Sequence, residues 1–265
     1  MRVAIVSNGN AFSAMMARGL FEKTEIVGVL VVSVPPGRGS RVGRLLRLAR
    51  RTGLRFAAYK TATLGIPVLR RVATGAPSTL AAQARRAGVP VMSVSSANGE
   101  TARAFLAGLQ PEVLLSISTP ERLDATVLAI PTRAAINTHW APLPRYAGIA
   151  PYFWVLRNGE EKTAITIHVM EPELDAGPIL QQSEVAINPS ESALGLQLKL
   201  ARSTGEPLIE ALLAIDSEKA EGKPQEGSAR EYFSWPSAAD VRAARERGHP
   251  LVRGSDLSAL WRESG

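Results

Sequence analysis

The sequence has no cysteine and only three histidines among its 265 residues. The absence of cysteine excludes disulfides, thiolate metal ligands and a cysteine nucleophile. With so few histidines an all-histidine zinc site is also unexpected, so we expect no metal centre. A chain without cysteine is typical of a cytoplasmic protein, and that is the localisation we expect.

Long apolar runs are also missing. No run reaches the roughly 18 residues that a membrane-spanning helix needs. The N-terminal MRVAIVSNGN resembles a strand more than a secretion signal, because no charged region and long apolar stretch precede a cleavage site. Hydrophobic residues make up 45% of the chain and charged residues 21%, which indicates a globular protein with a substantial core.

Acidic residues are absent from one long segment. Between Ile26 and Asn98 there is no Asp or Glu but there are twelve Lys or Arg, ten of them from Arg38 to Arg71, and the net charge is +7. This segment is either a solvated basic face or a surface for an anionic partner such as a phosphate, a nucleotide, RNA or a polyglutamate tail. Few aromatic residues are interleaved with it, so a nucleic-acid role is not favoured. A basic amphipathic helix at Val42–Leu54 leaves membrane-surface binding as a further option.

Apolar segments alternate between strand-like and helix-like patterns. The predicted strands are Arg2–Ser7, Glu25–Val32, Val89–Val94, Val113–Ile117, Ala134–Thr138, Ala164–Val169 and Ile179–Ile187. The predicted helices are Phe12–Phe21, Val42–Arg51, Thr79–Ala87, Thr101–Leu109 and Pro151–Asn158. A break is expected at Pro35–Gly37, and the stretch leading to Gly75 shows no clear pattern. The alternation predicts an α/β fold, a Rossmann-like, open, mostly parallel sheet with helices on both faces.

The C-terminal third contains one more helix and then a change in composition. We expect Ser190 to cap a helix that runs to Leu213, with an interruption near Gly205–Pro207. Beyond Asp216 the chain becomes polar, and its last stretch carries scattered aromatic residues. We therefore expect one domain over residues 1–215 and a short extension, residues 216–265, that packs on it. The turn after the first strand has a single glycine, which disfavours nicotinamide or flavin binding there.

The residues suited to chemistry follow two later strands. Asn137 and His139 are two apart at the end of a predicted strand, so their side chains face the same way. His168 and Asp175 are seven apart, where another strand enters a proline-containing loop. A carboxylate beside an imidazole raises its basicity, and an amide N–H can stabilise a developing oxyanion. Taken singly, each residue has an ordinary structural role; together they indicate acyl transfer without a covalent intermediate.

The spacing of these motifs resembles the folate-dependent formyltransferases. That family carries an Asn-x-His segment, then Leu-Pro before a glycine, then Leu-Asp-x-Gly. The corresponding residues here are Asn137-Thr138-His139, Leu143-Pro144, Gly148 and Leu174-Asp175-Ala176-Gly177. The clear resemblance covers Val113–Ile187, with weaker agreement back to Met1.

The resemblance implies that 10-formyltetrahydrofolate is the formyl donor and a primary amine the acceptor. His139 would accept the proton of the amine, Asn137 would hold the formyl oxygen, Asp175 would tune His139, and His168 would be auxiliary. Two loops would contact the folate, and their residues are Ser118, Thr119, Pro120, Glu121, Arg122, Glu171, Glu173 and Leu174.

The chain departs from the family pattern after the histidine. Many members have Ser-Leu-Leu-Pro there, whereas this chain has Trp140-Ala141-Pro142-Leu143-Pro144. We therefore place Trp140 and Arg145 on the acceptor side, where they would alter which amine is accepted. Members that act on transfer RNA add a C-terminal barrel, for which the chain after Asp216 is too short.

The resulting hypothesis is N-formylation of a small amine, either an amino sugar nucleotide or an amino-acid-derived metabolite. The basic segment would suit an acceptor that is phosphorylated or carrier-bound. One alternative is formylation of methionyl-tRNA, which the net charge favours. Another is hydrolysis of formyltetrahydrofolate, although such hydrolases usually carry a further regulatory domain. A non-enzymatic folate- or RNA-binding protein is the remaining alternative. No pattern indicates an oligomeric state.

Overall fold

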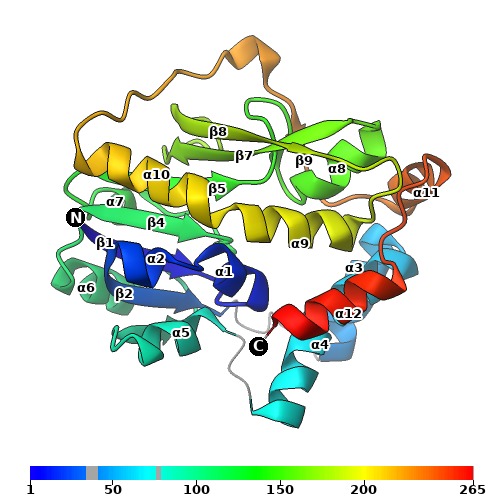
Figure 1. The fold of residues 1–265 in the computed structure, drawn as a ribbon, viewed down its shortest axis with the longest axis horizontal. Coiled ribbons are helices and arrows are strands. Elements are labelled where there is room, and N and C mark those ends of the chain that lie inside the picture. The colour runs from blue at the N-terminus through cyan, green and yellow to red at the C-terminus, as the bar shows by residue number, and fades with distance from the viewer. Residues whose placement is uncertain (34–40, 76–78, 265) are drawn as a thin grey trace.

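The computed structural model describes residues 1–33, 41–75 and 79–264 (Figure 1). Its strands are β1 Arg2–Ser7, β2 Glu25–Val32, β3 Val91–Val94, β4 Val113–Ile117, β5 Ala134–His139, β6 Ala147–Gly148, β7 Lys162–Val169, β8 Ile179–Ala186 and β9 Tyr232–Phe233. Its α-helices are α1 Ala11–Met16, α2 Leu20–Lys23, α3 Arg41–Thr52, α4 Leu54–Thr74, α5 Leu80–Arg86, α6 Glu100–Gly108, α7 Ala125–Leu128, α8 Pro151–Asn158, α9 Ala193–Ser203, α10 Gly205–Asp216, α11 Ala238–Glu246 and α12 Gly254–Glu263.

Seven strands form one sheet in the order β3-β2-β1-β4-β5-β7-β8. The first five are parallel, whereas β7 pairs antiparallel with β5 and with β8. The predicted mostly parallel α/β sheet is confirmed. Because the chain winds outward from β1 on one side and from β4 on the other, a crevice forms between the carboxyl ends of these two strands.

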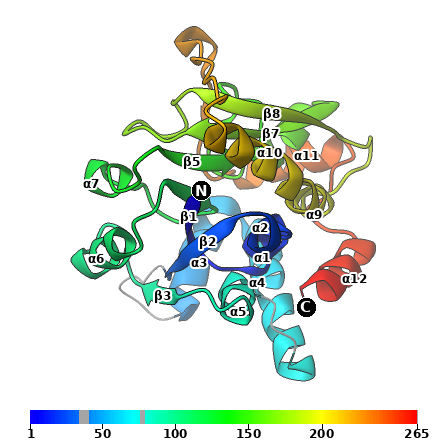
Figure 2. The ribbon, with the colours of Figure 1, turned by 60° about the vertical axis from the view of Figure 1, so that its left-hand side comes forward.

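Both faces of the central strands β1 and β4 are buried, as their continuous apolar runs indicate. Along β1, Val3 and Ile5 belong to one apolar cluster and Ala4 and Val6 to another. Helices α6 and α7 cover the second cluster, whereas α1, α5, α9 and α10 cover the first (Figure 2). The carboxyl ends of the parallel strands are therefore held by a core on each side.

Two helix predictions need correction. The single helix expected at Phe12–Phe21 is two short helices, because Gly19 adopts a left-handed conformation with φ 79° and separates α1 from α2. The predicted cap Ser190 is also wrong: Ser192 caps α9, and its side chain accepts a hydrogen bond from the Gly195 N–H at 2.8 Å. The expected interruption near Gly205–Pro207 is present as the break between α9 and α10.

The stretch without a clear pattern is the long helix α4. It follows α3, which matches the predicted helix at Val42–Arg51, and it contains Pro67. Its amino-terminal half buries Phe56 and Tyr59 in the core, whereas Leu69 and Val72 nearer its end are exposed. The break expected at Pro35–Gly37, with Arg38, lies outside the described residues.

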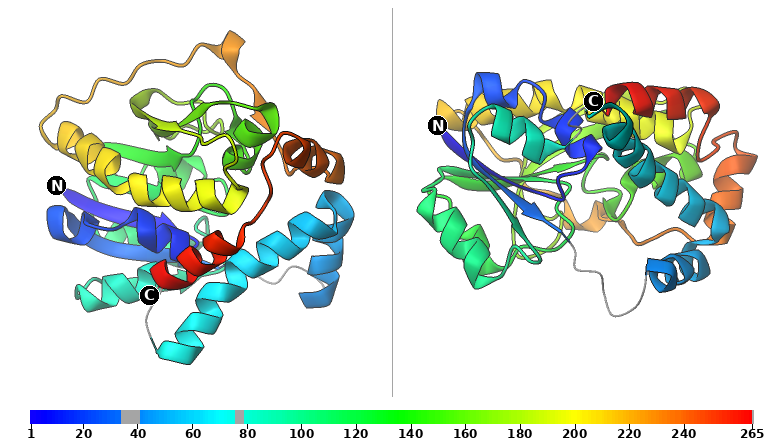
Figure 3. Two further views of the ribbon diagram at one scale, coloured as in Figure 1. Left: turned by 45° about the vertical axis from the view of Figure 1, so that its right-hand side comes forward. Right: turned by 90° about the horizontal axis from the view of Figure 1, so that it is seen from below.

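The C-terminal extension lies across the face of the molecule that α4 and α8 occupy. Trp235 meets the ring of Phe56 edge-on, with centroids 6.1 Å apart, and Leu260 of α12 is fully buried. Helix α12 lies alongside α4, as Figure 3 shows from two directions. The division into residues 1–215 and 216–265 stays a proposal. Among the described helices, none has the length and apolar character that crossing a lipid bilayer requires.

Candidate active site

A cleft of about 660 Å³ opens at the carboxyl ends of β1, β4 and β5. Asn137 and His139 lie at the end of β5 and face it, and Asp175 reaches it from the loop between β7 and β8. The predicted catalytic residues therefore meet in one cleft, because the strand pairing of β5 with β7 places the loop that follows β7 beside the end of β5. This is the edge at which open α/β sheets bind ligands.

The imidazole of His139 is buried and has a defined tautomer. Its Nε2 lies 2.8 Å from the carbonyl oxygen of Tyr146. Because a carbonyl only accepts, Nε2 donates, and a neutral ring then keeps its lone pair on Nδ1. This Nδ1 lies 3.7 Å from Oδ2 of Asp175. The basic nitrogen of His139 thus faces the Asp175 carboxylate.

The carboxylate of Asp175 is held by the main chain around it. The Gly148 N–H donates to its Oδ2 at 2.9 Å, and Asp175 itself has φ 53°, a left-handed conformation. Two residues later, a Cβ on Gly177 would lie 2.1 Å from the carbonyl oxygen of Val169. Only glycine fits there, and this explains the glycine of the Leu-Asp-x-Gly segment. The left-handed backbone of Asp175 is strained for a residue with a side chain, and such strain persists where the surrounding structure imposes it.

His168 orients the amide of Asn137. The two residues are directly paired across β5 and β7, and Nε2 of His168 lies 3.2 Å from Nδ2 of Asn137. His168 Nδ1 donates to the Val169 carbonyl at 2.8 Å, so Nε2 accepts from the amide. Burial lowers the pKa of His168, and the nearby His139 lowers it further, against the opposing pull of Asp175. A neutral His168 can keep accepting, and one N–H of Asn137 stays free for the cleft.

The C-terminal extension braces this site, which sequence reasoning missed. Gln225 donates to the carbonyl oxygens of Asp175 at 3.1 Å and of Gly177 at 2.7 Å. Strand β9 pairs with β6, which contains Gly148, the donor to the Asp175 carboxylate. Arg230 forms an ion pair with Glu173 in the same loop. The polar sequence around Gln225 has no periodicity that could have signalled these contacts.

The two loops predicted to contact the folate both line the cleft. Their lining residues include Ser118, Thr119, Pro120, Glu121, Arg122, Glu171, Glu173 and Leu174. The carboxylate of Glu121 is occupied by the Ala97 N–H and by the hydroxyl of Ser96, which donates at 3.0 Å. It therefore anchors its own loop to the turn after β3. Ser118 has φ 53°, a second left-handed residue at the rim of the cleft.

The two residues predicted for the acceptor side lie in different places. Trp140 lines the cleft, and its indole N–H donates to the Thr204 hydroxyl at 3.0 Å. Arg145 is not among the lining residues and forms ion pairs with Glu160 and Glu231. Its guanidinium also lies over the ring of Tyr146, 5.1 Å from the centroid. Arg145 therefore supports the loop after β5 from outside the cleft.

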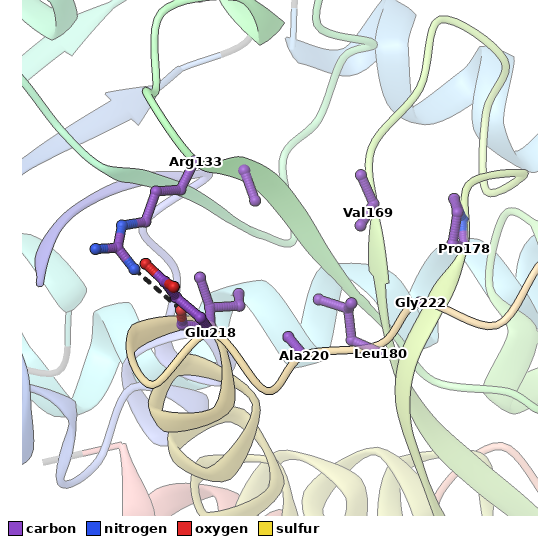
Figure 4. A pocket seen from close by; sticks show the side chains of 9 residues that line it. Arg133, Val169, Pro178, Leu180, Glu218, Ala220 and Gly222 are labelled. Atoms are coloured by element: carbon purple, nitrogen blue, oxygen red, sulfur yellow. Dashed lines mark hydrogen bonds between the residues drawn. The ribbon is translucent and has the colours of Figure 1, made fainter.

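A second hollow, of about 610 Å³, lies at the other end of the strands, where β5 begins and β7 ends (Figure 4). Its charged residues are Arg133 and Glu218, and the other side chains that Figure 4 labels are apolar or glycine. Arg133 is already engaged, because it pairs with Glu112 at 3.0 Å and donates to the Ile215 carbonyl at 3.1 Å. Within the described residues, no group of His, Cys, Asp or Glu could hold a metal ion.

The model of the formyl transferase family matches residues 1–212. The chain belongs to the formyl transferase family. The methionyl-tRNA formyltransferase of Thermotoga maritima is 37% identical over 157 residues, which are 59% of this chain and 50% of that one. That of Thermotoga neapolitana is 35% identical over 177 residues, 67% of this chain and 56% of that one. The chain thus spans about half the length of the curated relatives it matches.

Solved structures show the same fold. Phosphoribosylglycinamide formyltransferase from Anaplasma phagocytophilum superposes with a TM-score of 0.60 at 16% identity, covering 88% of this chain and 96% of that one. An N-formyltransferase from Helicobacter canadensis, in complex with folinic acid and dTDP-3-aminofucose, gives 0.53 at 16% identity, with 90% and 71% covered. At such identities these likenesses concern the fold of the formyl transferase domain alone.

Proposed function

We propose that this formyl transferase family member moves a formyl group from 10-formyltetrahydrofolate to the primary amine of a small molecule, an amino sugar nucleotide or an amino-acid-derived metabolite. The observation that carries the proposal is the meeting of Asn137, His139 and Asp175 in one cleft. A base, an oxyanion donor and a carboxylate are the groups that transfer of an acyl group to an amine requires. No nucleophilic side chain is needed, because the amine is itself the nucleophile.

The cleft fits a folate. Its volume lies within the range of pockets for small molecules, and its walls combine apolar and aromatic side chains with many polar and charged ones. We place the folate between the Ser118–Arg122 loop and the Glu171–Leu174 loop, where Pro120 and Met170 offer apolar surface to a flat ring. Bound there, 10-formyltetrahydrofolate would supply the formyl carbon. The Helicobacter canadensis neighbour, described with folinic acid, supports a folate as the ligand.

The side chains then divide the proton and charge movements between them. The amine nitrogen bonds to the formyl carbon, the bond from that carbon to the folate nitrogen breaks, and one amine proton passes to Nδ1 of His139. His139 returns this proton to the departing folate nitrogen, so protons balance. Asp175 stabilises the transient imidazolium at Nδ1, while the Tyr146 carbonyl keeps the ring oriented. Asn137 donates its free N–H to the oxygen that gains charge.

Formylation of methionyl-tRNA is the second candidate. The sequence relatives named above are methionyl-tRNA formyltransferases, and the net charge of +7 would favour an RNA partner. Against a dedicated RNA surface, few aromatic side chains are interleaved with the basic segment to stack on bases.

Mass spectrometry separates these candidates. The protein is incubated with 10-formyltetrahydrofolate in three parallel reactions. One contains a pool of small amines, one contains methionyl-tRNA, and one contains no amine. A gain of one formyl group on a small amine supports the proposal, and formylation of methionyl-tRNA alone replaces it with the second candidate. Formate release without any amine would indicate the hydrolase. If none of these occurs and folate still binds, the chain is a binding protein and the proposed function fails.

A further inference from the structure

One wall of the cleft contains a lysine set among aromatic rings, and none of the motifs accounts for it. Lys60 of α4 lines the cleft, and its ammonium lies 5.7 Å from the ring centroid of Tyr59, 5.9 Å from that of Tyr152 and 5.8 Å from that of Trp235. These residues come from α4, α8 and the C-terminal extension. The folate-side loops, by contrast, follow β4 and β7.

The positive charge of Lys60 has no carboxylate partner among the described residues, whose ion pairs all involve other cations. Among the described residues, its ammonium makes one hydrogen bond, to the Tyr152 hydroxyl at 3.4 Å. An ammonium has three N–H donors, so two remain for a ligand.

The surrounding groups hold this charge in place without neutralising it. Tyr59 is buried and donates to Oε1 of Gln197 at 2.5 Å, and Gln197 also lines the cleft. Burial, together with the neighbouring Tyr152, raises the pKa of Tyr59 well above its ordinary value, so Tyr59 stays uncharged. Lys60 is only partly exposed, and in such surroundings an ammonium attracts an anion more strongly than it does in bulk solvent.

The wall connects directly to the catalytic residues. Tyr152 lies in the first turn of α8, four residues after Gly148, whose N–H donates to the Asp175 carboxylate. Resting on the proposed function, we propose that Lys60, with Tyr152 and Trp235, binds an anionic group of the acceptor, a phosphate or a carboxylate, and so positions its amine at His139. Lys60 is then a specificity residue for acidic amines and takes no part in the chemical step.

The first test measures anion binding by calorimetry, using inorganic pyrophosphate and, separately, succinate. Lys60→Met removes the charge and keeps the stem, Lys60→Arg keeps the charge, and Lys23→Met removes an equal charge from the exposed end of α2. We expect the Kd of the anion that binds to rise at least tenfold in Lys60→Met and to change less than threefold in the other two variants. Pyrophosphate and succinate distinguish a phosphate from a carboxylate. An unchanged Kd in Lys60→Met, or no binding of either anion to the parent protein, overturns the proposal.

The second test uses kinetics with the amine found by mass spectrometry. In Lys60→Met we expect the KM for the acceptor to rise about tenfold while kcat and the KM for the folate change less than twofold. A rise confined to the folate KM would assign the anion to the folate's own carboxylates and overturn the proposal. If the parent protein formylates no amine, the proposed function fails, and the calorimetric test still decides whether Lys60 binds anions.

Discussion

The two sides of the cleft are built in different ways. On the sheet side, Asn137 and His168 face each other in a β5–β7 register, and Asp175 follows on the next loop. On the opposite wall, Lys60, Tyr152 and Trp235 come from α4, α8 and the extension. Strand pairing fixes the geometry of the first side, whereas the second depends on how helices pack. The helix side of the cleft can therefore vary without altering the strand pairing that fixes the sheet side.

The largest expected effect is on the sheet side. Asp175→Asn keeps the shape of the loop but removes the charge that stabilises protonated His139, so kcat for formyl transfer should fall about 10²- to 10⁴-fold. Steady-state kinetics at saturating folate measures this. Glu184→Gln, on the exposed side of β8, is the matched control and should keep the parent rate. If Asp175→Asn retained a third or more of kcat, the sheet side would not be the catalytic one.

Gly177→Ala tests whether the loop after β7 tolerates a side chain. The new Cβ would lie 2.1 Å from the Val169 carbonyl oxygen, so the backbone that carries Asp175 must shift. We expect the free energy of unfolding to fall by about 2 kcal/mol, with a loss of activity. Urea denaturation measures the first effect. Gly108→Ala, which meets nothing within 4 Å at the end of α6, serves as the control, and equal stability of the two variants would refute the steric argument.

Gln225→Ala tests whether the extension, which contributes Trp235 to the helix side of the cleft, also supports the sheet side. The variant loses two hydrogen bonds to the carbonyls of Asp175 and Gly177. We expect kcat/KM to fall about tenfold, because the loop loses two contacts worth roughly 1 kcal/mol each. Gln181→Ala, which loses a surface contact to Glu210, is the control. Unchanged kcat/KM in Gln225→Ala would mean that the two sides are independent.

The smallest expected effect concerns pH. Burial lowers the pKa of His168 in the folded protein below the value of about 6.5 in the unfolded chain. Between the folded and unfolded pKa values of His168, the unfolded chain binds the proton more readily. The stability that neutral His168 contributes above pH about 6.5 is therefore lost as the pH falls. Urea denaturation at pH 5 to 8 should show this slope, at most about 1.4 kcal/mol per pH unit. His168→Gln should flatten it, and an unaltered slope would contradict a neutral, accepting His168.

Much of this architecture is readable from local patterns. The buried strands and their parallel order follow from continuous apolar runs between helices, and α8 begins at Pro151 as its sequence predicts. The helix prediction is wrong where a single residue changes the backbone conformation, as left-handed Gly19 does between α1 and α2. Helix α4 was missed because its apolar residues are divided between the core and an exposed surface, which blurs its periodicity.

The sequence by itself determined which residues are the candidates for catalysis in this formyl transferase family member, because Asn137 and His139 end one apolar strand and Asp175 lies in the loop that follows another. Tertiary structure decided three things that no local signal carries. It placed Lys60 beside Tyr152 and Trp235, directed Arg145 away from the cleft and brought Gln225 onto the Asp175 loop. The physical reason is that these contacts join segments far apart in the chain, and only the packing of helices and extension on the finished sheet brings them together.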